Sequence, residues 1–366
     1  MSQVGVDVLA ARERLAQGYR RLKLRHADGA TGASVCTATT ALRDEVIRDL
    51  YWQALQDLGA AGPAGLDSRV ALVAHGGYGR GDVAPFSDVD LLLLHDGVEN
   101  TAVAKLAERL VHGVFDAGLL LGHSVCTLTQ ACELALQDPP LCTSLGESRL
   151  VAGSGALLAA FRARFRRQIS RRWKPLLAAV DQARAEERMR YGETVFLLEP
   201  NLKRSRGGLR DIQLVRWVGF LRYGQADPGR LAQTGGLSAA DAAALAAASE
   251  FLLRLRNELH FHADKAADVL DRAEQLRIAD QQGYPPQSGM LPVEQFMRDY
   301  FRHTSQVSHI STQFVAKARS RERLTRLVTA VFGHRVEGLR VGPAGIVAAG
   351  RALRRLRGNL DRKSVV

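Results

Sequence analysis

Two aspartates separated by one residue, Asp88 and Asp90, stand directly before four leucines in the segment SDVDLLLL. Residues two apart in a strand point to the same face, so we expect both carboxylates side by side at the start of a buried strand. Their repulsion is unfavourable unless a positive charge lies between them. A divalent cation is the simplest such charge, because hard cations take oxygen ligands. The alternative is a pair of solvated acids at a strand edge.

A glycine pair, Gly76 and Gly77, follows the short apolar run at residues 69–75. Glycine allows backbone amides to approach a ligand closely. Outward-facing amides in a loop, or at the start of a short helix, suit phosphate groups. Arg80 could add a charged fork to the same phosphates. The spacing matches neither a P-loop nor a dinucleotide-binding fingerprint, and the alternative is a tight turn with Arg80 in solvent.

A second unusual stretch is EPNLKRSRGGLRD at residues 199–211. Its proline interrupts any helix, and its glycine pair requires special backbone geometry or a close approach. The stretch is strongly cationic, and Lys203 and Arg210 are expected to face a triphosphate from the opposite side of a cleft. The alternative is a structural loop whose Asp211 caps the helix that follows.

The elements that position these residues can be predicted from hydrophobic periodicity. Strands are expected at 69–75, 89–95 and 119–127, with an amphipathic helix at 101–118. This arrangement is an α/β unit that closes near residue 150, and from about residue 155 the pattern is helical. Residues 1–60 are also expected to be helical, with Thr40 as an N-cap. The predicted units are therefore 1–60 (N-terminal helices), 61–154 (α/β domain), 155–316 (helical domain) and 317–366 (basic tail).

Composition limits the class of protein. The chain has 366 residues, 46% of them hydrophobic, and a net charge of +12. No signal core and no apolar run of about 18 residues occurs, so we expect no membrane association. The basic residues are scattered, so we do not expect a nucleic-acid partner. The four cysteines are Cys36, Cys126, Cys132 and Cys142. Their spacing suggests neither a zinc site nor a disulfide framework, which favours a cytoplasmic setting.

Together, the glycine pair and the carboxylates indicate nucleotidyl transfer. The glycine loop would hold the triphosphate, and the aspartates would hold Mg²⁺, or Mn²⁺ in its place. One ion would activate the incoming hydroxyl and the other would stabilise the leaving pyrophosphate.

The sequence resembles the bacterial PII uridylyltransferase/uridylyl-removing enzymes of the nucleotidyltransferase superfamily. The resemblance extends over roughly residues 25–310 and rests on several motifs in order. These are GGYGRGDVAPFSDVDLLLL at 76–94, GHSVCT at 122–127, ESRLVAG at 147–153, EPNLK at 199–203, GGLRD at 207–211 and VEQFMRDYF at 293–301.

This resemblance implies an α/β nucleotidyltransferase domain, a small mixed sheet with flanking helices, followed by an all-helical domain. It also implies transfer of UMP from UTP, with AMP as the alternative, to a tyrosine of a small PII-like nitrogen-regulatory protein. Asp88 and Asp90 carry over as the catalytic metal pair. Gly76 and Gly77 carry over as the phosphate loop, and Ser87 lies beside the pair.

Three features depart from the family pattern. Family members continue into a His-Asp hydrolase domain, which removes the uridylyl group, and two ligand-sensing ACT domains, and the 366 residues leave no room for them. Cys126 stands where the family usually has arginine. A third carboxylate is common in the superfamily on a later strand, and the strand expected at 119–127 has none. Glu147 is a candidate, with a helix-surface position or a structural salt bridge as the alternatives. A second hypothesis is therefore a catalytically reduced nucleotide-binding regulatory module. A third is a nucleotidyltransferase acting on RNA or a small molecule.

Overall fold

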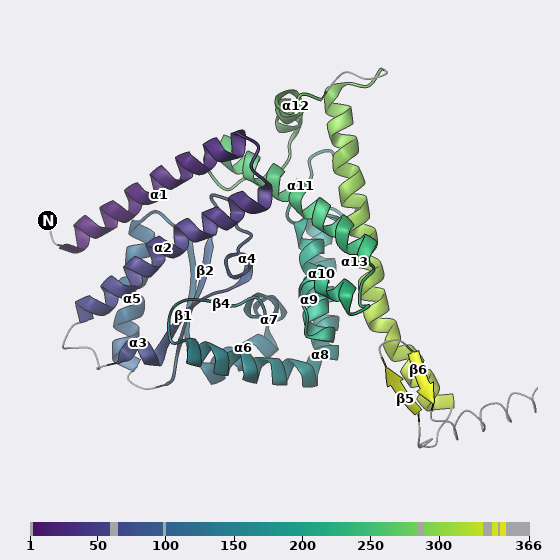
Figure 1. Cartoon of the computed structure of the whole chain (residues 1–366), viewed down its shortest axis with the longest axis horizontal. Helices are drawn as coiled ribbons and strands as arrows, with labels where there is room; N and C mark the ends of the chain where they lie inside the picture. Colours follow the sequence, from purple (N-terminus) through teal and green to yellow (C-terminus); the bar gives the residue numbers. More distant parts are fainter. Residues whose placement is uncertain are drawn as a thin grey trace, which may run out of the picture.

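The structure, a computed structural model, describes residues 3–58, 65–97, 100–284, 289–331, 339–342 and 345–348. A four-stranded mixed sheet with strand order β3-β2-β1-β4 forms the centre of its N-terminal part (Figure 1). β1 pairs antiparallel with β2 and β4, whereas β2 and β3 run parallel. The strands are β1 (Val70–Ala74), β2 (Val89–His95), β3 (Leu121–Thr127) and β4 (Arg149–Gly153).

The antiparallel pairing of β1 and β2 brings the two predicted motifs to the same edge of the sheet. Ala74, the last residue of β1, pairs with Leu91 near the start of β2. The His75 N–H then donates a hydrogen bond to the carbonyl oxygen of Asp90 at 3.1 Å. The glycine pair that follows β1 therefore lies beside the aspartates that begin β2.

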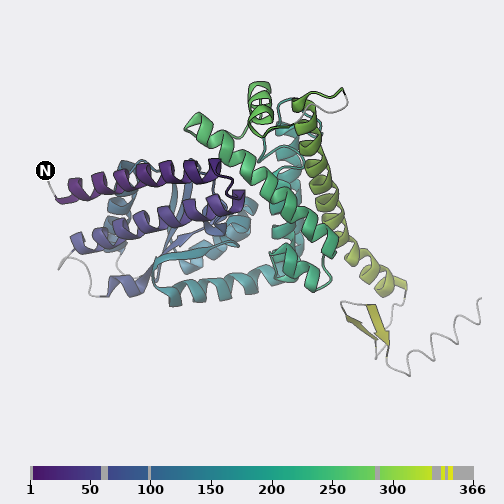
Figure 2. The same ribbon diagram turned by 45° about the horizontal axis from the view of Figure 1, so that its top comes forward.

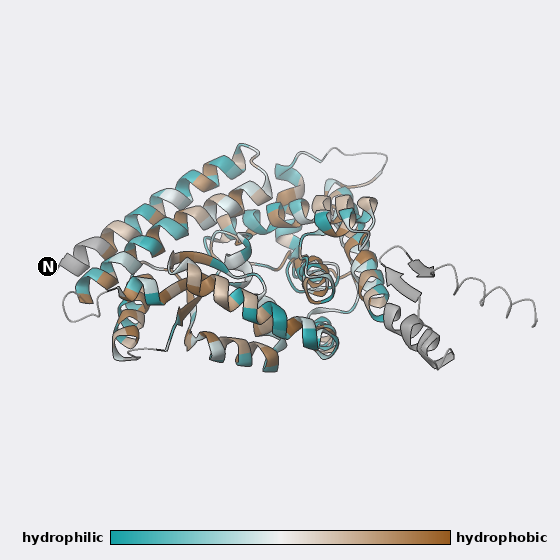
Figure 3. Ribbon diagram, turned by 60° about the horizontal axis from the view of Figure 1, so that its bottom comes forward, coloured by the Kyte–Doolittle hydropathy of each residue, from teal (hydrophilic) through white to brown (hydrophobic). Residues whose placement is uncertain are grey.

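Both faces of the sheet are covered by helices, which explains the uninterrupted leucines of β2. Leu91 and Leu93 pack in a core with the first two helices and α5, whereas Leu92 and Leu94 pack in a second core with α6, α7 and the next helix, α8 (Gly155–Tyr191). Figure 3 shows hydrophobic colouring concentrated on the strands. The helices of this part are α1 (Gln3–Ala27), α2 (Gly32–Leu58), α3 (Leu66–Arg69), α4 (Gly76–Arg80), α5 (Asn100–Asp116), α6 (Leu128–Gln137) and α7 (Pro139–Leu145).

The rest of the described chain is almost entirely helical. Its first helix, α8, is kinked at Arg172, which has non-helical backbone angles (φ −121°, ψ 16°) three residues before Pro175. Figures 1 and 2 show the long helix α13 on the flank away from α1. The elements are α8 (Gly155–Tyr191), α9 (Leu209–Tyr223), α10 (Pro228–Gln233), α11 (Ala239–Ala263), α12 (Arg272–Gln281), α13 (Pro292–Val331) and a hairpin of β5 (Leu339–Gly342) with β6 (Gly345–Ala348).

Glu258 of α11 joins three helices. Its carboxylate lies 2.9 Å from Nε2 of His26 on α1 and accepts a hydrogen bond from Nη1 of Arg277 on α12 at 2.7 Å. Burial raises the pKa of Glu258, but the hydrogen bonds from His26 and Arg277 outweigh it and lower the pKa to about 2. The ionised carboxylate is therefore stabilised by its two partners.

The predicted fold class is confirmed: a small mixed sheet with flanking helices precedes a helical part. Thr40 is not an N-cap, however, because α2 begins at Gly32. The Glu250 carboxylate of α11 accepts hydrogen bonds from the backbone amides of Gly32 and Ala33 and so caps the helix earlier. Helix α13 passes through the predicted boundary at 316/317, and the unit boundaries remain predictions. Among the described helices, none combines the length and apolar character that crossing a membrane requires.

Candidate active site

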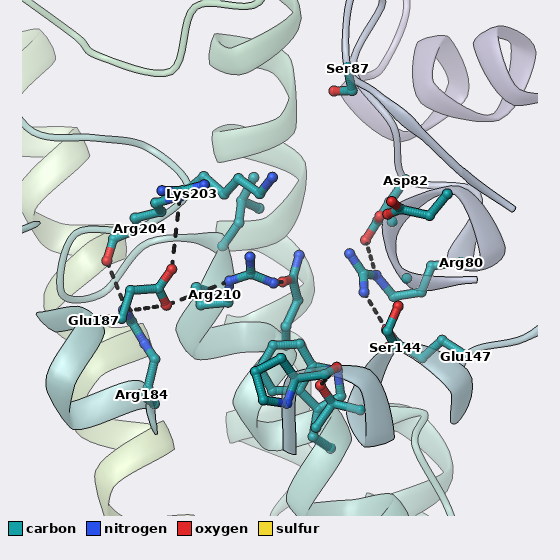
Figure 4. A pocket seen from close by; sticks show the side chains of 18 of the residues that line it. Arg80, Asp82, Ser87, Ser144, Glu147, Arg184, Glu187, Lys203, Arg204 and Arg210 are labelled. Atoms are coloured by element: carbon teal, nitrogen blue, oxygen red, sulfur yellow. Dashed lines mark hydrogen bonds and ion pairs between the residues drawn. The ribbon is translucent and has the colours of Figure 1, made fainter. Parts of the chain in front are cut away.

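A cavity of about 700 Å³ lies between the sheet edge and helices α8, α9 and α11. Figure 4 shows its two walls, with Arg80 and Ser87 on one and Lys203 and Arg210 on the other. Segments distant in sequence therefore meet at one cavity. All eight predicted site residues line it: Gly76, Gly77, Arg80, Ser87, Asp88, Asp90, Lys203 and Arg210.

The two carboxylates lie at the start of β2 in different environments. Asp88 precedes the strand and is exposed, whereas Asp90 is its second residue and is partly buried. Burial raises the pKa of Asp90 to about 6, the charge of Asp88 adds to this rise, and Lys203 opposes it. Asp90 consequently retains a proton under mildly acidic conditions. A divalent cation between the carboxylates would replace that proton and remove their repulsion.

Two glycines make room for the Asp90 side chain. Gly76 has a positive φ of 58°, and a Cβ at this position would lie 2.8 Å from Ser144 Oγ and 3.2 Å from Asp90 Oδ2. Gly122 pairs with Asp90 across β2 and β3, and a Cβ there would lie 2.7 Å from Asp90 Oδ1. The sequence did not reveal this role of Gly122. A glycine inside a strand is the available signal, since it marks a close approach.

Arg80 is already paired inside the wall of the cavity. Its Nε donates to Asp82 Oδ2 at 2.7 Å, and its Nη1 donates to Glu147 Oε2. Glu147 also pairs with Arg216 at 3.4 Å, and its side chain is only 5% exposed. Glu147, the candidate third carboxylate, is thus paired with two arginines, which agrees with the salt-bridge alternative.

Lys203 and Arg210 supply positive charge on the opposite wall. Burial lowers the pKa of Lys203 to about 8, and the charges of Arg256 and Arg210 add to the drop. Within the described part of the chain, no carboxylate lies within salt-bridge distance of the Lys203 ammonium. Arg210 donates to Gln213 at 2.9 Å and lies 3.6 Å from Glu187, and burial lowers its pKa. This wall therefore has cationic charge that an anionic ligand can neutralise.

Asp211 anchors the cationic segment but does not cap the helix that follows. Helix α9 has Gly208 at its N-cap position, without a side-chain cap. The fully buried Asp211 carboxylate accepts hydrogen bonds from Arg184 at 2.8 Å, from Arg188 at 2.6 Å and from the Gly207 amide at 2.7 Å. Burial alone would raise the pKa of Asp211, but the two arginines lower it. The segment is thus fixed to α8, which positions Lys203 and Arg210.

Cys126 lies away from the cavity. It is four positions beyond Gly122 on β3 and packs in the core with Cys132 and Leu94. It is not among the residues that line the cavity. The position at which the sequence departs from the expected family pattern is therefore not part of the cavity wall.

A metal ion at this site would take protein ligands from Asp88 and Asp90. The described residues contain no group of three or more His, Cys, Asp or Glu side chains arranged to hold a metal. Two carboxylates still fit Mg²⁺, which is commonly held by one or two carboxylates together with substrate phosphates and water. The donor set therefore suits a metal that arrives with a nucleoside triphosphate.

Two family models match parts of this chain. Residues 62–131 match the family model "Nucleotidyltransferase domain", and residues 175–315 match "GlnD PII-uridylyltransferase". The resemblance to the PII uridylyltransferase family is confirmed. The chain carries a nucleotidyltransferase domain, as predicted.

Relatives named bifunctional uridylyltransferase/uridylyl-removing enzyme share this region. The protein of Pseudomonas savastanoi pv. phaseolicola is 36% identical over 249 residues, which is 67% of this chain and 27% of that protein. The Azotobacter vinelandii protein is 37% identical over 241 residues, 64% of this chain and 26% of that protein. The Bradyrhizobium sp. protein is 32% identical over 283 residues, 77% of this chain and 30% of that protein. The match therefore spans less than a third of each relative's length.

Proposed function

We propose that this chain is a Mg²⁺-dependent nucleotidyltransferase that transfers UMP from UTP to a tyrosine of a PII-like nitrogen-regulatory protein in the cytoplasm. The observation that carries this proposal is the carboxylate pair of Asp88 and Asp90, which shares one cavity with Lys203 and Arg210. A pair of acids suits a metal, and the facing cations suit a triphosphate. The names of the relatives favour a uridylyl group and a PII acceptor.

In this reaction the tyrosine oxygen attacks the α-phosphorus of UTP. The bond from that phosphorus to the oxygen bridging to the β-phosphate breaks, pyrophosphate leaves, and the hydroxyl proton is released. Bound Mg²⁺ would supply charge stabilisation for the phosphates and activation of the hydroxyl. Asp88 and Asp90 would hold the metal, while Lys203 and Arg210 would bind the charge of the triphosphate. Gly76 would leave room for the Asp90 side chain to hold the metal.

The test is a labelling assay with UTP labelled at the α-phosphate, Mg²⁺ and a purified PII protein. We expect labelled PII protein and release of pyrophosphate, and a parallel arm with ATP determines the nucleotide preference. Asp88→Asn and Asp90→Asn should each abolish labelling. Asp271→Asn is a matched control, because Asp271 caps α12 outside the cavity and asparagine is also a good N-cap. Full activity of either Asp88→Asn or Asp90→Asn would refute the metal assignment.

A further inference from the structure

The segment that leads to Asp88 has no regular secondary structure between α4 and β2. It has a few local backbone hydrogen bonds, such as the one from the Ser87 N–H to the Ala84 carbonyl oxygen at 3.0 Å, and side chains from other parts of the chain add further contacts. Arg43 of α2 donates from Nη2 to the carbonyl oxygen of Pro85 at 2.6 Å, and from Nε to the hydroxyl of Tyr19 at 3.0 Å. The first contact fixes the start of the short stretch that ends at the carboxylate pair.

Helix α11 holds the next two residues. The Phe86 N–H donates to Nδ1 of His260 at 3.2 Å, and Arg256 donates from Nη2 to Ser87 Oγ at 3.1 Å. Because Nδ1 accepts this bond, the ring proton of neutral His260 is on Nε2, which lies 3.3 Å from Asp268 Oδ1. The same oxygen accepts a bond from Arg256 Nε at 2.6 Å. One carboxylate thus orients both side chains that hold the segment.

These contacts are shielded from water. His260 is 0% exposed, Arg43 is 1% exposed and Arg256 is 6% exposed. Hydrogen bonds in such surroundings are strong, and losing one leaves a buried polar group without a partner. Asp88 and Asp90, by contrast, repel each other and would separate if the segment were free. A rigid approach to Asp88 consequently keeps both carboxylates in place for a shared cation.

We propose that His260, Arg256 and Asp268 are positioning residues for the reaction. They fix the backbone of Phe86 and Ser87, and through it the placement of Asp88 relative to Asp90. This inference rests on the proposed function, since it assigns the purpose of the contacts to the metal pair. Under this proposal, the helical part of the chain helps to place the metal ligands, in addition to forming the opposite wall of the cavity.

The experiment compares two variants of one residue that does not line the cavity. His260→Leu removes the acceptor of the Phe86 amide, whereas His260→Asn offers an oxygen in the place of Nδ1. Binding of Mn²⁺ is measured by electron paramagnetic resonance with a non-hydrolysable UTP analogue, and exchange of the Phe86 amide is measured by hydrogen–deuterium exchange. His260→Leu should weaken Mn²⁺ binding about tenfold or more, as the loss of residues that support metal ligands does, and it should speed hydrogen–deuterium exchange at the Phe86 amide. His260→Asn should restore most of both.

Glu258→Gln is the matched control, because it breaks contacts of the same helix with His26 and Arg277, and none of these three residues lines the cavity. It should lower the melting temperature without changing Mn²⁺ affinity. Asp268→Asn provides a second test if His260→Leu does not fold, and it should weaken Mn²⁺ binding in the same direction. Wild-type Mn²⁺ affinity in folded His260→Leu, or equal weakening in Glu258→Gln, would overturn the proposal.

The two proposals can fail separately in this design. A wild-type chain that transfers no nucleotide, but whose Mn²⁺ binding is weakened by His260→Leu, would refute the proposed reaction and support the positioning role. If the wild-type chain transfers UMP and the His260→Leu variant binds Mn²⁺ with unchanged affinity, the proposed reaction is supported and the positioning role is refuted.

Discussion

Replacing Lys203 by arginine should remove a pH dependence that the wild-type cavity gives to UTP binding. Burial lowers the pKa of Lys203 to about 8, with further contributions from Arg256 and Arg210. Only the protonated ammonium attracts a triphosphate. Because the charged form of lysine is the protonated one, this attraction is present below the pKa and is lost as the pH rises through it.

The size of the effect follows from that pKa. With a pKa of about 8, Lys203 is roughly 90% charged at pH 7, about half charged at pH 8 and roughly 10% charged at pH 9. If only the charged form binds, the apparent Kd for UTP rises about tenfold between pH 7 and pH 9. At pH 8 the bound triphosphate restores the full charge, so binding takes up about half a proton.

Isothermal titration calorimetry with Mg²⁺ and UTP, in pairs of buffers with different ionisation enthalpies, measures both quantities. Lys203→Arg should bind with nearly constant affinity and without proton uptake, because a guanidinium stays charged throughout this range. Lys203→Met should bind weakly at every pH and also without proton uptake. A tenfold fall in affinity that persists in Lys203→Arg would refute the assignment of Lys203 as the titrating cation.

Two further substitutions test the packing beside Asp90 and the contacts that join α11 to α1 and α12. Gly122→Ala would place a Cβ 2.7 Å from Asp90 Oδ1, so we expect about 100-fold slower UMP transfer and a loss of about 1–3 kcal/mol in the free energy of unfolding in urea. Gly155→Ala is the control, because its Cβ would have its nearest neighbour 3.7 Å away, and it should change neither the transfer rate nor the free energy of unfolding. Equal losses in both variants would exclude a clash with Asp90 as the cause. Glu258→Gln should lower the melting temperature near neutral pH. Since hydrogen bonds outweigh burial and lower the pKa of Glu258 from 4.5 to about 2, this stabilisation is complete above pH 4.5 and disappears as the pH falls toward 2. Circular dichroism melts that show a constant difference over this range would contradict the ionic origin.

The parts of the fold that depend on local sequence could be predicted. β2 begins after Asp88 as the spacing indicates, because a two-residue period and an apolar run describe a strand wherever it lies in the chain. The start of α2 could not be predicted in the same way. Its cap is Glu250, which is 218 residues away from Gly32 in sequence, and a local scan instead favours the side chain of Thr40.

The residues of the site also divide into those that have a local sequence signature and those that do not. The glycine pair, the aspartates and the cationic segment each have a local signature, and the structure brings them to one cavity. Arg256 has no such signature, and 169 residues separate it from Ser87, which it contacts. The pairing of Arg80 with Glu147 across 67 residues was equally hidden, because a sequence shows charges but not which opposite charges become neighbours.

The kink in α8 has a mechanical consequence. Both halves of α8 contribute side chains to the same core, and the half after Arg172 also carries Arg184 and Glu187, which line the cavity. Arg184 is twelve residues from the kink, a lever arm of about 18 Å at the usual rise of a helix. A change of about 5° in the bend would therefore move the cavity wall by roughly 1.6 Å, which is enough to make or break hydrogen bonds to a nucleotide.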